Sequence, residues 1–111
     1  MAMAHQTSKE VILHASDEAG DVQRAIEAAN TLRATDPELE ARIIVTGPAL
    51  SGLTGHDGLE IPEGVQVEAC RIGMGRRGIA EQELRPSVQT TPSAVVTIVQ
   101  AQSAGAAYVR I

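Results

Sequence analysis

The chain has 111 residues, a formal net charge of −5 at pH 7, one tyrosine, and neither phenylalanine nor tryptophan. The length predicts one domain, and the acidic balance without stacking aromatics argues against nucleic-acid binding. The single cysteine excludes an intrachain disulfide, and no Cys/His spacing of a zinc site or other metal or cofactor motif is present.

Residues 1–8 show neither a basic segment followed by an apolar one nor any other sign of a signal peptide. No apolar run approaches the length of a membrane span. We therefore expect a cytoplasmic protein with no membrane partner, in which a lone thiol stays reduced. Residues 1–8 are predicted to be a loose tail, and residues 9–111 the folded domain.

Strand-like segments recur along the domain as short, continuous apolar runs, which are typical of parallel strands covered on both faces. They are residues 10–14, 41–46, 65–69 and 106–111, with a weaker candidate at 86–90.

Helical patterns lie between these strands. A first helix is expected from about Glu18 to Arg33, with Ser16 or Asp17 as its N-cap. Shorter helical stretches are expected at 49–53 and 79–84. A last helix would begin with Thr91 as N-cap and Pro92 at the first helical position and end at Gly105, with an apolar face of Val95, Ile98, Val99 and Ala101. The alternation predicts a single three-layer α/β/α domain, Rossmann-like, with a mainly parallel sheet of about five strands.

Self-association is also expected. A core built only from Ala, Val, Ile and Leu gains less free energy per buried residue than one with large aromatic side chains, and a small domain buries a limited share of its surface. Oligomerisation adds apolar burial.

The lone cysteine, Cys70, closes the third strand-like run. A thiol at a strand end, facing a helix amino terminus and arginines, would have its ionisation favoured, and the thiolate is the nucleophile and sulfur acceptor. The alternative is that Cys70 is a small buried hydrophobe, as most free cysteines are.

Other candidates fall at the same edge, because ligands bind outside the carboxyl ends of parallel strands. His14 follows the first strand, and Gly47 with Pro48 follows the second. His14 would polarise a bound group or help deprotonate Cys70, since its ordinary pKa lies near neutrality. Alternatively it bonds only to nearby backbone.

Residues 71–78 (RIGMGRRG) are expected to form a loop. They contain a G-x-G-x-x-G match, but no acidic residue stands about twenty positions on, so a dinucleotide site is not supported. Gly73 and Gly75 would let the backbone approach Cys70. Arg71, Arg76 and Arg77 would form an anion-binding patch or simply a solvated face.

Several segments, taken in order, resemble the DsrE-like (DsrE/DsrF/DsrH) family of small α/β sulfur-relay proteins. They are residues 11–14 (VILH), 28–32 (AANTL), 45–50 (VTGPAL), 64–70 (GVQVEAC), 78–84 and 102–109 (QSAGAAYV). The likeness covers nearly the whole chain from about residue 9.

The resemblance implies a parallel sheet between helices, assembly as a homotrimer or homohexamer, and persulfide sulfur carried on Cys70 for a donor or acceptor protein. The chain would then be a sulfur carrier or sulfurtransferase component. The alternative is a non-catalytic oligomeric binding module for a small anionic ligand at the strand carboxyl ends. A third hypothesis, a nucleotide-dependent enzyme, is supported by the glycine pattern alone. Whether the protein is an enzyme stays open.

Overall fold

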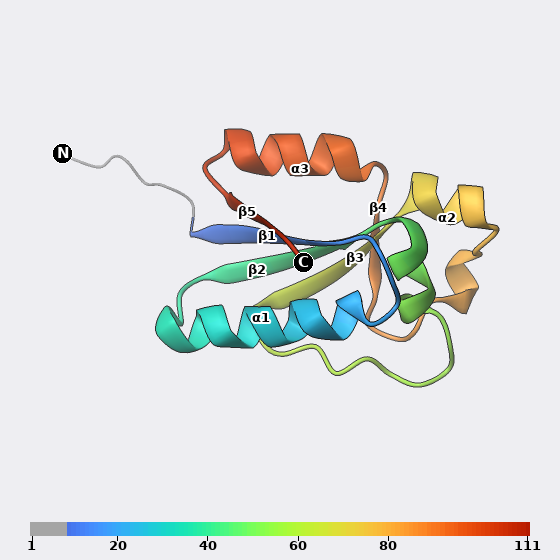
Figure 1. The fold of residues 1–111 in the computed structure, drawn as a ribbon, viewed down its shortest axis with the longest axis horizontal. Coiled ribbons are helices and arrows are strands. Elements are labelled where there is room, and N and C mark those ends of the chain that lie inside the picture. The colour runs from blue at the N-terminus through green and yellow to red at the C-terminus, as the bar shows by residue number, and fades with distance from the viewer. Residues whose placement is uncertain (1–8) are drawn as a thin grey trace.

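Five strands form one parallel sheet in the order β4-β3-β2-β1-β5 in the computed structural model, which describes residues 9–111 (Figure 1). The tail expected at residues 1–8 lies outside the described residues. The elements are β1 (Glu10–Ala15), α1 (Asp21–Thr35), β2 (Glu40–Val45), the 3-10 helix η1 (Gly47–Leu53), β3 (Val65–Cys70), α2 (Arg71–Arg77), the 3-10 turn η2 (Glu81–Glu83), β4 (Gln89–Thr91), α3 (Ala94–Ser103) and β5 (Ala107–Arg110).

The sheet separates α1 from α3, so the expected three-layer α/β/α architecture with a parallel sheet is confirmed (Figure 1). Side chains alternate between the two faces of each strand. Leu13, Ile43 and Val67 join the larger core on the α1 side. Ile12 and Ile44 pack with Cys70 on the α3 side. The thiol therefore lies beneath α3.

Helix α1 begins later than its sequence pattern indicated. The expected start at about Glu18, capped by Ser16 or Asp17, is wrong, because the helix starts at Asp21. The Asp21 carboxylate instead accepts hydrogen bonds from the backbone N–H groups of Asp17 and Glu18 and from Arg24. Burial raises the pKa of Asp21, but these hydrogen bonds outweigh it and hold the pKa below its usual value.

The segment predicted as an arginine-rich loop, residues 71–78, is mostly a helix. Helix α2 starts directly after Cys70 and ends at Gly78, which adopts the left-handed conformation with φ of 66°. Met74 buries its side chain in the α1-side core. Gly73 lies so close to η1 that a β-carbon there would be 2.9 Å from Leu50 Cδ1. Gly73, one of the glycines that indicated a loop, thus permits close packing of α2 against η1. The helical stretch expected at 79–84 is reduced to η2.

Helix α3 starts two residues later than expected, at Ala94 instead of Pro92. Ser93, not Thr91, is the N-cap, and its Oγ accepts the N–H of Val96. The expected apolar face is only partly buried, since Ala101 is covered while Val95 and Val99 are 73% and 57% exposed. Apolar residues occur on nearly every side of this helix, so its sequence does not define one face.

Candidate functional site

A pocket of about 480 Å³ opens at the carboxyl end of the sheet, on the α3 side. It brings together six of the residues singled out in the sequence, namely His14, Gly47, Cys70, Gly73, Arg76 and Arg77. Their elements are adjacent because β1, β2 and β3 are neighbours in a parallel sheet and end at the same edge.

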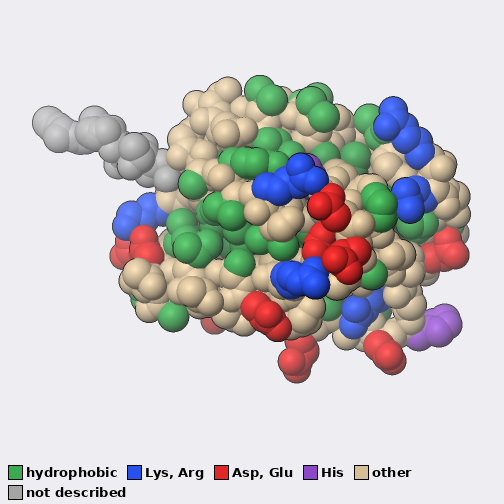
Figure 2. All heavy atoms as spheres, in the orientation of Figure 1, with side chains coloured by type: hydrophobic (Ala, Val, Ile, Leu, Met, Phe, Trp, Pro, Cys, Tyr) green, Lys and Arg blue, Asp and Glu red, His purple; other side chains and the backbone are tan. Residues whose placement is uncertain are grey.

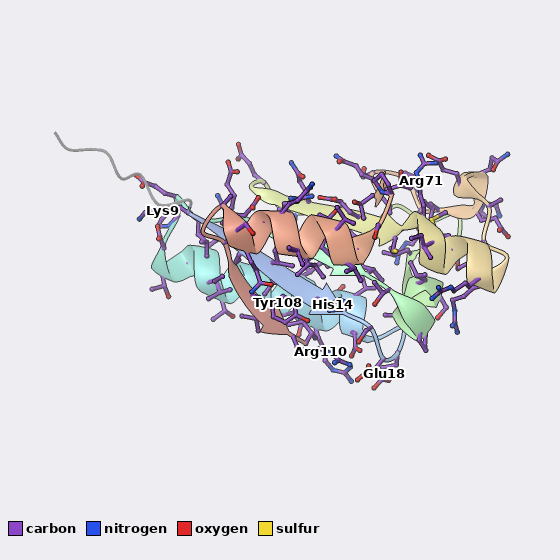
Figure 3. All side chains as sticks on the ribbon, turned by 90° about the horizontal axis from the view of Figure 1, so that it is seen from above. Lys9, His14, Glu18, Arg71, Tyr108 and Arg110 are labelled. Atoms are coloured by element: carbon purple, nitrogen blue, oxygen red, sulfur yellow. The ribbon has the colours of Figure 1, made fainter. Side chains whose placement is uncertain are left out.

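The other three predicted residues do not line this pocket. Arg71 turns to the neighbouring strand and η2, where it donates to Thr90 Oγ1 at 3.0 Å and to Glu81 Oε2 at 3.3 Å. Pro48 is exposed at the start of η1, and Gly75 is exposed on α2. In Figure 3, Arg71 lies well away from His14.

Cys70 is the last residue of β3 and only 6% exposed, yet it forms part of the pocket wall. Its Sγ accepts a hydrogen bond from the backbone N–H of Ala94 at 3.4 Å. That donor belongs to the first turn of α3, whereas the sequence indicated the segment directly after the cysteine. A helix amino terminus presents N–H groups and partial positive charge to a sulfur anion.

His14 is held by two side chains, one from β5 and one from the residue that directly follows β2. Its Nδ1 is 2.7 Å from Tyr108 Oη, and its Nε2 is 2.9 Å from Thr46 Oγ1 (Figure 3). Burial and the Arg110 guanidinium lower the pKa of His14, while Asp17 opposes them. Both ring nitrogens are engaged, and within residues 9–111 no hydrogen bond joins His14 to Cys70. His14 is therefore a fixed polar group in the pocket wall.

The lowered pKa of His14 predicts how the stability of the fold changes with pH. The unfolded chain, with a pKa of about 6.5, binds a proton more readily than the folded one. The contribution of His14 to the free energy of unfolding is therefore present above about pH 6.5. It is lost as the pH falls toward and through the lower pKa that His14 has in the folded chain. His14→Gln should show a smaller loss of urea stability between about pH 7 and pH 5 than the parent chain. Equal losses would contradict this account.

Arg76 and Arg77 differ from the other basic side chains. Within residues 9–111, Lys9 and the other six arginines all donate a hydrogen bond to a carboxylate, a hydroxyl or a backbone carbonyl. Arg76 and Arg77 make no hydrogen bond or ion pair with the described part of the chain. Both are exposed and both line the pocket.

Six further residues line the pocket and were not predicted as site residues from the sequence. They are Thr46, Ile72, Ser93, Ala94, Val95 and Ile98. Thr46 directly precedes Gly47, so its place at a strand end was a usable signal. Nothing in the local sequence shows that the first turn of α3 lies over Cys70, because that contact depends on the strand order.

The described residues hold no group of three or more His, Cys, Asp or Glu side chains arranged for a metal ion. Across residues 9–111, no helix combines the length and apolar character needed to cross a membrane.

No family model and no curated protein matches this chain. The solved structures that are similar to it include two small proteins. One is MTH1491 from Methanobacterium thermoautotrophicum, a protein of unknown function, with a TM-score of 0.77 and 21% identity. The other is the ychN protein from E. coli, with a TM-score of 0.66 and 19% identity. Each match covers 92% of this chain and 98% of the other. At these identities the likeness is one of fold, and the chain has the fold of these two small proteins.

Proposed function

We propose that the chain is a DsrE-like sulfur carrier or sulfurtransferase component that accepts persulfide sulfur on Cys70. The observation that carries the proposal is the position of the thiol. Cys70 lies in the wall of an open pocket at the carboxyl end of β3, and its Sγ accepts the N–H of Ala94. A sulfur acceptor needs access for a donor and stabilisation of negative charge on sulfur.

The reaction is a thiol–persulfide exchange. The Cys70 thiolate attacks the outer sulfur of a donor persulfide, the sulfur–sulfur bond of the donor breaks, and the donor leaves as a thiolate, which takes up the proton that the outer sulfur carried. No external oxidant or reductant is required. Because the sequence contains one cysteine, onward transfer needs the thiol of another molecule. A donor or acceptor protein in the cytoplasm fits this requirement.

Mass spectrometry after incubation with inorganic polysulfide tests this function. The intact protein should gain the mass of one sulfur atom, and dithiothreitol should remove it. Cys70→Ser should gain none while keeping its circular dichroism spectrum, because serine replaces a buried side chain of similar size. Gln102→Ala, on α3 but outside the pocket, leaves the thiol and the pocket lining unchanged, so it should still load. A folded parent chain that stays unloaded and is inert to iodoacetamide would refute the proposal.

We also propose that the protein works as a homotrimer or homohexamer. Val96 and Val99 on α3 are more than half exposed, and Val109 on β5 is 42% exposed. Hydrophobic side chains line the outer side of the α3 region in Figure 2. Such a patch favours association.

Light scattering should give a mass well above 11.6 kDa for the parent chain. Val96→Lys with Val99→Lys should lower that mass, because charges would be buried in the contact. Gln102→Lys, on the same helix, should not. A parent chain that elutes as a monomer would contradict the assembly.

A second candidate function is a non-catalytic module that binds a small anion. Arg76 and Arg77, which have no partner within residues 9–111, favour it, as does the small exposed fraction of Cys70. This module would bind its ligand equally well after Cys70→Ser, and its thiol would not accept sulfur.

A further inference from the structure

The lining of the pocket beside Cys70 has two parts of different chemistry. The apolar part, here called the apolar wall, is formed by Ile72 of α2 and by Val95 and Ile98 of α3. The cationic part is formed by Arg76 and Arg77, which follow Ile72 on α2. Ile72 and Val95 are 49% and 73% exposed, so an occupant would cover apolar surface that now faces solvent.

The size of the pocket fits a small organic molecule. Its volume of about 480 Å³ lies within the range of roughly 300–1,000 Å³ typical of ligand sites. Sulfide or a short inorganic polysulfide would leave the apolar wall uncovered. A compact molecule with an aliphatic body would contact that wall while its reactive sulfur reached Cys70.

The arginines indicate what the other end of that molecule carries. The chain is acidic overall, and Lys9 and the other six arginines are engaged within residues 9–111, yet these two guanidinium groups have no partner among the described residues. Guanidinium groups bind carboxylates through paired, charge-assisted hydrogen bonds. The basic side chains over α2 are visible at the upper right of Figure 2.

We propose that this pocket selects low-molecular-weight organic persulfides that carry a carboxylate on an aliphatic body. This inference rests on the proposed function of Cys70. Arg76 and Arg77 hold the carboxylate, and Ile72, Val95 and Ile98 cover the aliphatic chain. The Cys70 thiolate takes the outer sulfur, the donor sulfur–sulfur bond breaks, and the carboxylate-bearing thiol leaves with the proton.

The test compares two donors that differ in one group, mercaptohexanoate persulfide and the uncharged mercaptohexanol persulfide. The rate of Cys70 loading is measured by intact-mass spectrometry. The parent chain should load faster from the carboxylate donor. Arg76→Ala with Arg77→Ala should slow that donor about tenfold, which is the effect expected from losing a charge-assisted hydrogen bond. The alcohol donor should be unaffected. Arg71→Ala, on the same helix but outside the pocket, should change neither rate.

The apolar wall is tested by shortening the donor. Mercaptoacetate persulfide keeps the carboxylate and lacks most of the aliphatic chain, so it should load more slowly than mercaptohexanoate persulfide. Equal loading rates from the long and short donors would refute the claim that the apolar wall contacts the aliphatic chain of the donor.

The outcomes separate this inference from the function on which it rests. If inorganic polysulfide and all three organic donors fail to load Cys70, the sulfur-carrier function is wrong. If Cys70 loads at the same rate from the carboxylate and alcohol donors, the function stands and the donor selectivity is refuted. If the double arginine variant slows both donors equally, the arginines act on thiol reactivity and the carboxylate site is again refuted.

Discussion

Replacing Leu50 with alanine should lower the free energy of unfolding by about 3–4 kcal/mol, within the range for fully buried leucines. Leu50 is completely buried in η1 and belongs to the α1-side core. Its Cδ1 also lies against Gly73 of α2. The loss combines the transfer free energy of the missing methyl groups with the cavity left between η1 and α2. Urea denaturation monitored by circular dichroism measures it.

A double-mutant cycle with Gly73→Ala tests the contact itself. Alone, Gly73→Ala should destabilise the domain, because its new methyl group would meet Leu50 at 2.9 Å. In the double variant the same methyl group enters the cavity, so the combined loss should be smaller than the sum of the single losses. Val11→Ala is the control, because Val11 lies near the amino end of β1, away from η1 and α2. Its loss of stability should add to that of Gly73→Ala without coupling. An additive Leu50–Gly73 cycle would contradict the packing described here.

Arg42→Ala should destabilise the domain by about 3 kcal/mol, the lower end of the cost of breaking a buried ion pair. Arg42 on β2 donates from Nε and from its terminal nitrogen to the two carboxylate oxygens of Glu68 on β3, at 2.8 Å and 2.9 Å. The Glu68 side chain is 6% exposed and the Arg42 side chain 26%. The hydrogen bond to Glu68 raises the pKa of Arg42, against the effect of burial. Removing the guanidinium leaves a buried carboxylate without its cation.

The matched control replaces both partners. Arg42→Met with Glu68→Leu removes the pair and leaves no uncompensated buried charge, so it should recover most of the loss. Both variants are compared with the parent chain by urea denaturation at neutral pH. If the double variant is as unstable as Arg42→Ala, the stranded Glu68 carboxylate is not the cause of the loss.

The strands and their layers were predictable because buried parallel strands carry an unmistakable pattern. Residues 10–14 and 41–46 each contain a continuous apolar run, residues 65–69 alternate apolar and polar side chains, and the structure places β1, β2 and β3 there. The helix boundaries were harder to predict from the sequence. Two glycines in α2 indicated a loop, although close packing against Leu50 requires Gly73 in a helix. The start of α1 depends on how Asp21 binds the preceding backbone, which spacing alone does not reveal.

The residues of the candidate site that stand at strand ends could be predicted from the sequence. The contacts that depend on the order of the strands in the sheet could not. His14, Gly47 and Cys70 follow three apolar runs, and they do meet at one pocket. The contact of His14 with Tyr108 exists because β5 pairs with β1, and these residues are far apart in sequence. The contact of Cys70 with Ala94 likewise requires α3 to lie over β3.

The hydrogen bond between Ala94 and Cys70 joins the sulfur directly to the first turn of α3. A persulfide would place its terminal, charge-bearing sulfur about 2 Å beyond the atom that Ala94 now contacts. The first turn of α3 would then face a longer side chain with its charge displaced toward the pocket. Val95, the next residue, is 73% exposed on that turn. A molecule docked on this end of α3 would therefore be in a position to distinguish an empty carrier from a loaded one.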